Sequence, residues 1–147
     1  MTKYFEELIY IGKTPPEKFT VFTTPHEFFE TIKDSRFDCR RLIILDGCEF
    51  PKVSFSPKPA ELDFNNFWQE LSEHGSHVLA FYETFNRLKT SNLDYTKIFA
   101  HRVACNLPPS HIQQLGNVQL PRDFDDKFKA VYLYSEQVTW FQPFAEN

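Results

Sequence analysis

Glycine and basic residues are both scarce in this sequence, and each shortage removes a class of function. Four glycines among 147 residues are too few for a glycine-rich phosphate-binding loop in addition to ordinary turns. The sixteen Lys and Arg residues are outnumbered by twenty Asp and Glu residues, which gives a formal net charge of −4. A protein that binds nucleic acid directly carries the opposite excess, so we expect no such activity.

The sequence also contains no long apolar run. The longest are Leu42–Leu45 and Val78–Tyr82, whereas a helix that crosses a membrane needs about 20 apolar residues. Near the N-terminus, Glu6 and Glu7 stand where a signal peptide would be apolar without interruption. We therefore expect a cytoplasmic protein that does not act at a membrane.

Cysteine is too rare and too irregularly spaced for a disulfide framework or a structural zinc site. Such sites use an even number of cysteines or CxxC pairs, and this chain has Cys39, Cys48 and Cys105. Reduced thiols are the normal state of cysteine in a cytoplasmic protein. Because no cofactor-binding motif accompanies them, we expect neither a bound metal nor an organic cofactor.

Hydrophobic and aromatic residues are abundant. They make up 41% and 17% of the chain, and Phe alone occurs 17 times. A chain of 147 residues has the usual length of one domain and can bury a substantial core. We accordingly expect residues 1–147 to form a single globular domain.

The first half of the chain alternates between strand-like and helix-like segments. Thr24-Pro25-His26-Glu27 combines a capping residue, a proline at the first helical position and a glutamate three residues after the cap. This capping box predicts a helix that runs to about Asp34. Apolar runs predict strands around it, one of them ending in the turn dipeptide Asp46-Gly47. The strands expected here are Glu7–Ile11, Phe19–Thr23, Arg40–Asp46 and a short edge strand, Lys52–Ser56.

A second helix is predicted after Asp63, which can cap it. Its apolar residues fall at i, i+3, i+4 and i+7, and Gly75 suits the left-handed position after a helix. A short third helix is predicted over Ser110–Leu115 from the capping-box spacing of Ser110 and Gln113, with Gly116 as the stop after it. The apolar positions of the second helix are Phe64, Phe67, Trp68 and Leu71.

The remaining β-rich segments complete the predicted fold. They are His77–Tyr82, which could instead continue as a helix through Phe85 and Leu88, Lys97–Cys105, and Ala130–Phe141 as a hairpin or one long strand. Together these elements predict an α+β domain. We expect a mostly antiparallel sheet of five to seven strands, with two main helices and one short helix packed on it.

Histidines and one aspartate are the candidates for catalysis. The chain has no GxSxG, HExxH or Walker sequence. His74 and His77 lie close to Glu73, and His101 could approach them across a sheet, but zinc needs three or four converging ligands. Asp46 follows a buried strand, where many α/β enzymes place an acid, although Asp-Gly is foremost a turn dipeptide. An enzyme that uses these histidines with Asp46 is an alternative hypothesis.

Three segments resemble parts of the barstar family of ribonuclease inhibitors. They are Arg40–Gly47, Asn66–Leu71 and His77–Phe81, and they follow that family's order of a strand ending in Asn-Gly or Asp-Gly, a Trp-bearing helix and another strand. The chain lacks the family's aromatic-glycine pair, and Gln69 stands where the family has an acid. The resemblance implies an inhibitor that binds its target protein.

The leading hypothesis is a small immunity or inhibitor protein that neutralises a basic toxin or nuclease by binding it. Residues 1–73 carry thirteen acidic and nine basic side chains. Acidic side chains can occupy a basic active site while aromatic side chains anchor the contact. The other alternative is a structural subunit that assembles into a homo-oligomer through exposed Phe residues. The expected partner-binding residues are Phe50, Phe55, Glu61, Asp63, Glu70 and Glu73.

Overall fold

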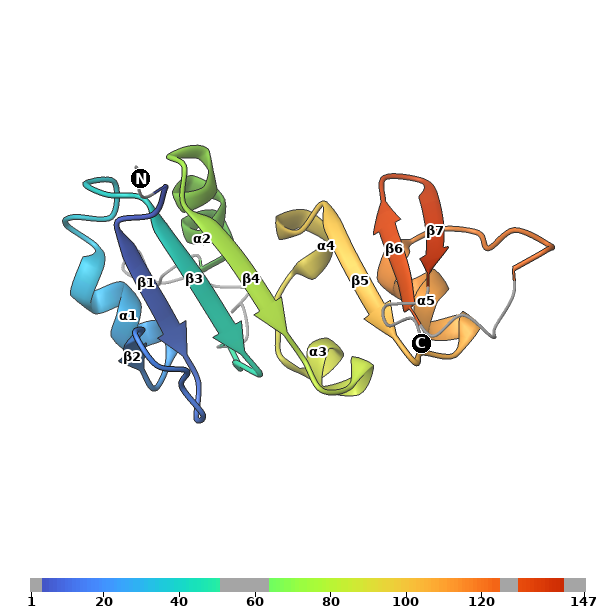
Figure 1. The fold of residues 1–147 in the computed structure, drawn as a ribbon, viewed down its shortest axis with the longest axis horizontal. Helices are drawn as coiled ribbons and strands as arrows, with labels where there is room; N and C mark the ends of the chain where they lie inside the picture. Colours follow the sequence, from blue (N-terminus) through green and yellow to red (C-terminus); the bar gives the residue numbers. More distant parts are fainter. Residues whose placement is uncertain (1–3, 51–63, 125–129, 142–147) are drawn as a thin grey trace, which may run out of the picture. The chain divides into compact units, whose positions relative to one another are not determined.

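The computed structural model describes residues 4–50, 64–124 and 130–141 of the chain (Figure 1). It contains both helices and strands, as predicted, and divides into two compact units, Met1–Leu93 and Asp94–Asn147. The prediction of one domain over residues 1–147 stays a prediction. In the described ranges, no helix is long and apolar enough to cross a membrane.

The first unit contains sheet A, a four-stranded sheet in the order β2-β1-β3-β4. All its neighbouring strands run parallel, so the predicted mostly antiparallel sheet is wrong. The physical reason is that one helix lies between β2 and β3 and another between β3 and β4, because a chain that returns through a helix enters the sheet in the same direction. The strands are β1 (Glu7–Ile11), β2 (Thr20–Phe22), β3 (Arg41–Asp46) and β4 (His77–Phe81).

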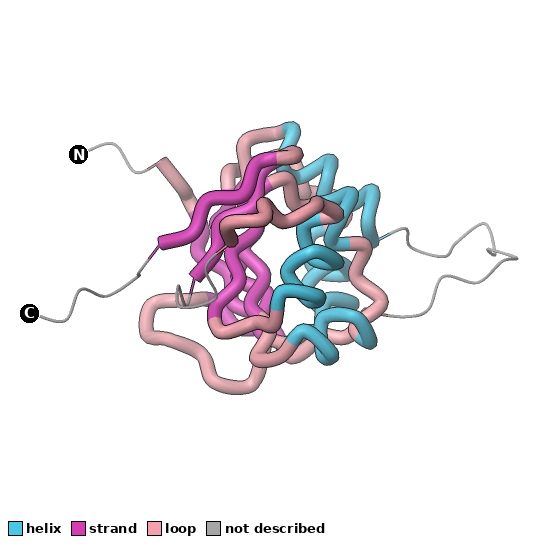
Figure 2. The backbone as a smooth tube through the Cα atoms, turned by 90° about the vertical axis from the view of Figure 1, so that its right-hand side faces the viewer, coloured by secondary structure: helices cyan, strands magenta, loops and turns pink. Residues whose placement is uncertain are grey.

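Two helices, α1 (Pro25–Ile32) and α2 (Phe64–Glu73), cover one face of sheet A (Figure 2). Their aromatic side chains meet over the sheet, where the rings of Phe28 and Trp68 stack with centroids 6.0 Å apart. The strand residues beneath them are buried, and these two layers form the core of the unit. The buried strand residues on this face are Ile9, Ile11, Ile43 and Leu45.

The predicted start of α1 is confirmed, with one change in its capping contacts. Thr24 is the N-cap, and its Oγ1 accepts a hydrogen bond from the Glu27 backbone N–H at 3.2 Å. The Glu27 carboxylate reaches one residue further back than a capping box requires, because it accepts from the backbone N–H and hydroxyl of Thr23. The Thr24 contact satisfies a donor that the first helical turn leaves open, and the Glu27 contacts fix the residue before the cap.

After β4 the chain enters a separate short helix, α3 (Phe85–Thr90). The expectation of a strand from His77 is confirmed, and the alternative of one continuous helix through Leu88 is wrong. Thr84 caps α3, since its side chain accepts from the Arg87 backbone N–H at 3.2 Å. The segment therefore contains both elements, separated by a capping residue.

The second unit contains α4 (Tyr95–Ile98), α5 (Pro109–Gly116) and sheet B, an antiparallel sheet in the order β5-β6-β7. The expected C-terminal hairpin is confirmed, with Ser135 in its turn at φ 54°. The strand expected from Lys97 begins only at His101, because a helical turn precedes it. The strands are β5 (His101–Cys105), β6 (Ala130–Tyr134) and β7 (Gln137–Phe141).

The predicted capping role of Ser110 is wrong. Helix α5 begins one residue earlier, with Pro108 at the N-cap position and no side chain acting as the cap. At the other end, Gly116 is the last helical residue and Asn117 takes the left-handed conformation at φ 50°. Asparagine tolerates this conformation better than most residues, which explains how the helix ends without a glycine after it.

Candidate functional site

Sheet A has one face that α1 and α2 leave uncovered. Side chains alternate between the two faces of a strand, so the neighbours of the buried core residues point to the other side. On that side Leu79 is 45% exposed and Phe81 55% exposed. Parallel sheets are normally covered on both faces, so the exposed Val21, Leu79 and Phe81 are unusual, while Leu8, Leu42 and Ile44 on the same face are partly exposed. We call this side of the sheet the open face and define it by Leu8, Val21, Leu42, Ile44, Leu79 and Phe81.

An aspartate stands at one end of the open face. The register of the parallel strands places Asp46 of β3 beside Phe81 of β4, with both side chains on the open side. Tyr10 of β1 lies on the same side and donates a hydrogen bond from its hydroxyl to the Asp46 carboxylate. Burial raises the pKa of the Tyr10 phenol, and the hydrogen bond and charge of Asp46 raise it further. Tyr10 therefore stays protonated as the donor that orients Asp46.

This contact depends on a glycine in the chain that leaves β1. A Cβ atom at Gly12 would lie 3.0 Å from the Asp46 Cβ and 3.1 Å from the Tyr10 ring and hydroxyl. Any larger residue would push apart the two side chains that are hydrogen-bonded. Gly12 therefore allows the backbone to pass close to the tyrosine–aspartate pair.

The loops at this edge of sheet A carry further acidic residues. We call Asp46, Glu49 and Glu83 the acidic rim, and all three are exposed. Two hydrogen bonds fix the loops to one another, from the Tyr82 hydroxyl to the Cys48 carbonyl at 2.7 Å and from the Gly47 N–H to the Phe81 carbonyl at 2.8 Å. The acidic rim thus begins where the open face ends, at an edge of the sheet whose loops are held together by hydrogen bonds.

Cys48 lies within this edge but is not an accessible nucleophile. Its thiol is buried and donates to the Ile11 carbonyl at 3.2 Å. Burial raises the pKa of the Cys48 thiol to about 11. Since the thiolate is the reactive form of cysteine, the edge offers carboxylates and apolar surface for binding and no activated thiol at Cys48.

The residues predicted to bind a partner do not lie on the open face where the structure describes them. Glu70 and Glu73 are on α2, and the Glu70 carboxylate lies 3.4 Å from Nε of Arg36. Phe50 is only 5% exposed, and its ring meets Trp68 edge to face at 6.2 Å. Phe55, Glu61 and Asp63, like the predicted edge strand Lys52–Ser56, lie outside the described residues.

The structure does not bring His77 and Asp46 together. His77 is opposite Leu42 at the start of β4, while Asp46 is opposite Phe81 at its end, which separates them by roughly 13 Å at the usual rise of a strand. His74 stacks on Phe37 with ring centroids 3.8 Å apart, and His101 contacts the Tyr132 hydroxyl at 2.6 Å. Among the described residues, no group of three or more His, Cys, Asp and Glu side chains could hold a metal ion.

Comparisons with known proteins give no relative. A scan against protein-family models, a search of curated proteins and a search of solved structures each found no significant match to this chain. The likeness to the barstar family therefore rests on the three short segments of sequence alone.

Sequence reasoning missed the principal residues of this site. Leu79 and Phe81 lie in a strand that was predicted, but no local pattern tells which face of a strand will remain uncovered. Tyr10 and Gly12 carry no motif, because their contact with Asp46 joins strands far apart in the sequence. The turn dipeptide at Asp46 was the one available signal.

Proposed function

We propose that this protein works by binding another protein through the open face and the acidic rim. The observation that carries the proposal is the exposed pair Leu79 and Phe81 beside the Asp46 carboxylate. We expect a partner that presents apolar side chains flanked by Lys or Arg. Contiguous apolar surface with a polar border is the usual composition of a protein-binding site.

The apolar side chains supply most of the expected affinity. Fully burying a Leu or Phe side chain contributes about 1.5–3 kcal/mol. Leu79 and Phe81 are about half exposed, so a partner that covers both gains roughly half of that for each. Large side chains held on a rigid strand lose little conformational entropy on binding, which favours them as anchors.

The acidic rim supplies selection by charge. The rim carries three carboxylates, and Lys13 after β1 is a basic residue at the same edge. A net negative border speeds the approach of a basic partner and makes the association sensitive to salt. It also disfavours acidic proteins that could otherwise cover the apolar face.

Within this role, an immunity or inhibitor protein remains our proposal. Enzymes that act on nucleic acids have basic substrate sites, and carboxylates held in place of phosphates can fill such a site. The braced geometry of Asp46, with Tyr10 as its donor, supports such a use because a preorganised carboxylate loses less entropy on binding.

The test uses the full chain in two double variants. The chain is immobilised, partners are captured from the host's lysate at low and high salt, and the dissociation constant of each purified partner is then measured. We expect Leu79→Ser with Phe81→Ser to weaken binding by tenfold or more. Glu70→Lys with Glu73→Lys, on α2, is the matched control and should leave affinity unchanged. The reverse pattern would assign the contact to α2 and overturn the proposal.

A second candidate function, self-assembly, is favoured by the edge position of β4. Among the residues that the structure describes in sheet A, β4 pairs with β3 alone, and its sequence HVLAF has no Asp, Glu, Lys or Arg. Antiparallel pairing of two copies about Leu79 would set His77 opposite Phe81 without opposing like charges. Light scattering during size-exclusion chromatography distinguishes self-assembly from binding of another protein. Self-assembly predicts a dimer or larger species for the unmodified chain and a monomer for Leu79→Ser.

A further inference from the structure

A cavity at the other end of sheet A is not used by the proposed protein contact. It has a volume of about 600 Å³ and lies between the first half of β1 and the end of α1. It exists because β2 is short and pairs only with Ile9–Ile11, which leaves the edge of β1 open at Glu7 and Leu8. This volume is within the range of sites that hold small molecules.

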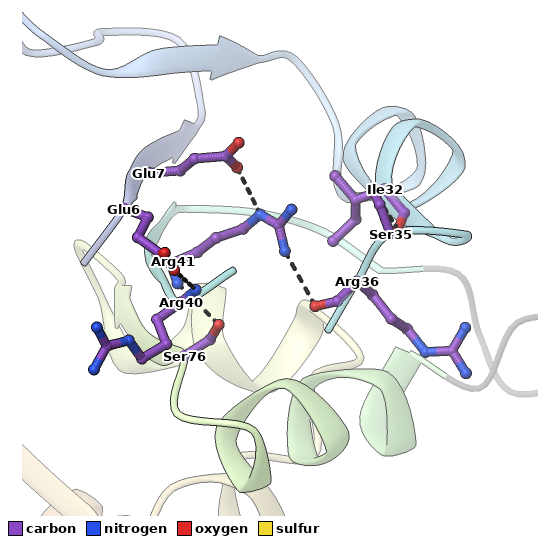
Figure 3. A network of polar contacts seen from close by, with 8 residues as sticks. All are labelled: Glu6, Glu7, Ile32, Ser35, Arg36, Arg40, Arg41 and Ser76. Carbon is purple, nitrogen blue, oxygen red and sulfur yellow. Dashed lines mark hydrogen bonds and ion pairs between the residues drawn. The ribbon is translucent and has the colours of Figure 1, made fainter. Parts of the chain in front are cut away.

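Arg41 forms the charged floor of this cavity. It is 3% exposed, and two of its guanidinium nitrogens are held in place. Nε donates to Glu7 at 2.7 Å, and Nη1 donates to the Arg36 carbonyl at 3.1 Å (Figure 3). Within the described part of the chain, Nη2 has no hydrogen-bond partner. Nη2 is not one of the buried polar atoms without a partner among the described residues, so this nitrogen stays accessible and can donate to a ligand.

Charges of both signs line the cavity. Lys18 adds a second cation, while Glu6 and Glu7 contribute carboxylates. The side chain of Glu7 is 48% exposed, and only one of its oxygens receives the bond from Arg41. A phosphate or another multiply charged anion would be repelled by these carboxylates, so the lining favours a ligand with one positive and one negative group.

The rest of the lining is apolar or carries a hydroxyl. The apolar side chains are Ile9, Phe22 and Ile32, and Thr20, Thr31 and Ser35 supply hydroxyls. Two opposite charges near an apolar wall match the three parts of an amino acid with an apolar side chain.

We propose that this cavity binds a free amino acid with an apolar side chain. Arg41 Nη2 and Lys18 receive the carboxylate, Glu7 receives the ammonium group, and the apolar wall covers the side chain. The inference is independent of the open face, which lies on the other side of sheet A.

Calorimetric titration of the full chain with L-leucine, L-methionine and L-phenylalanine tests this inference. Nα-acetyl-L-leucine lacks the ammonium charge and L-leucinamide lacks the carboxylate. We expect at least one free amino acid to bind, and both leucine derivatives to bind at least tenfold more weakly than L-leucine when leucine is the ligand. If methionine or phenylalanine is the ligand, its own Nα-acetyl and amide derivatives are compared with it in the same way. No binding of the three amino acids at millimolar concentration, or equal binding of the derivatives, overturns the proposal.

Three variants place the ligand in the cavity. Glu7→Gln and Lys18→Gln each remove one charge, and Thr31→Trp fills the space from α1 without changing a charge. We expect each to weaken binding tenfold or more, while Lys13→Gln, which alters a lysine outside the lining, leaves binding unchanged. Circular dichroism checks that each variant is folded. Unchanged binding in all three folded lining variants would place the ligand elsewhere and overturn the proposal.

Discussion

Phe81 and Asp46 lie side by side on the open face of sheet A, one on β4 and the other on β3. An exposed aromatic ring and an exposed carboxylate are therefore held at a fixed separation by the strand register. A partner that covers Phe81 must also satisfy or avoid the charge of Asp46, which joins affinity and selectivity in one contact.

Removing the charges of the acidic rim should slow association with a basic partner. In the triple variant Asp46→Asn, Glu49→Gln and Glu83→Gln, we expect association about tenfold slower at low ionic strength and little changed at high salt. Surface plasmon resonance over a series of salt concentrations measures this. Glu70→Gln with Glu73→Gln is the control, and an equal loss at all salt concentrations would contradict a role in charge steering.

Gly12→Ala should destabilise the first unit. The added Cβ would meet Asp46 and Tyr10 at distances that force one of them to move, and overpacking of this kind costs about 1–3 kcal/mol. Urea denaturation measures the free energy of unfolding. The double variant Gly12→Ala with Tyr10→Phe should recover part of the loss, since the hydroxyl is one of the groups in contact. No loss in the single variant would show that this edge is looser than the contacts imply.

Two of the predicted helix caps, Thr24 and Ser110, should respond differently to alanine. Thr24→Ala removes a side chain that accepts from Glu27, and we expect a loss of about 1 kcal/mol. Ser110→Ala should change stability little, because Ser110 is exposed and is not the cap of α5. Thr24→Ser keeps the cap and is the control for the first variant. Equal losses for Thr24→Ala and Ser110→Ala would contradict the observed helix starts.

Stability should fall in alkaline solution as buried groups ionise. Burial raises the pKa of the Cys48 thiol to about 11 from 9.0, so the unfolded state releases this proton at a lower pH than the folded state does. The resulting stability is present below pH 9 and is lost as pH rises towards 11. Thermal melting across this range measures it, and Cys48→Ala should flatten the decline. An unchanged slope in Cys48→Ala would assign the decline to other groups, such as Tyr82, whose pKa burial raises to about 12.

The elements of the first unit could be predicted because their signals are local. Thr24 and Gly75 mark helix ends through backbone chemistry that the nearest residues decide, and the structure places α1 and α2 accordingly. Strand direction is not local in this sense. The strands on either side of α1 run in the same direction with β1 between them, but the count of short β-rich segments along the whole chain favoured an antiparallel sheet, which sheet B contains and sheet A does not.

The candidate site was harder to predict because it depends on which surface stays uncovered. Leu79 and Leu45 are both apolar residues in predicted strands, yet one is 45% exposed and the other is fully buried. Only the position of α1 and α2 on one face distinguishes them. The cavity beside Arg41 likewise results from the shortness of β2. No single residue in the sequence predicts that this strand will be short.

The edge position of β4 has a consequence for how the isolated protein behaves in solution. An uncharged apolar strand at a sheet edge is a template on which other chains can add, and it promotes aggregation. A partner that covers β4 would protect this strand while also raising the melting temperature through binding. Co-production with such a partner should therefore increase the soluble yield of the chain.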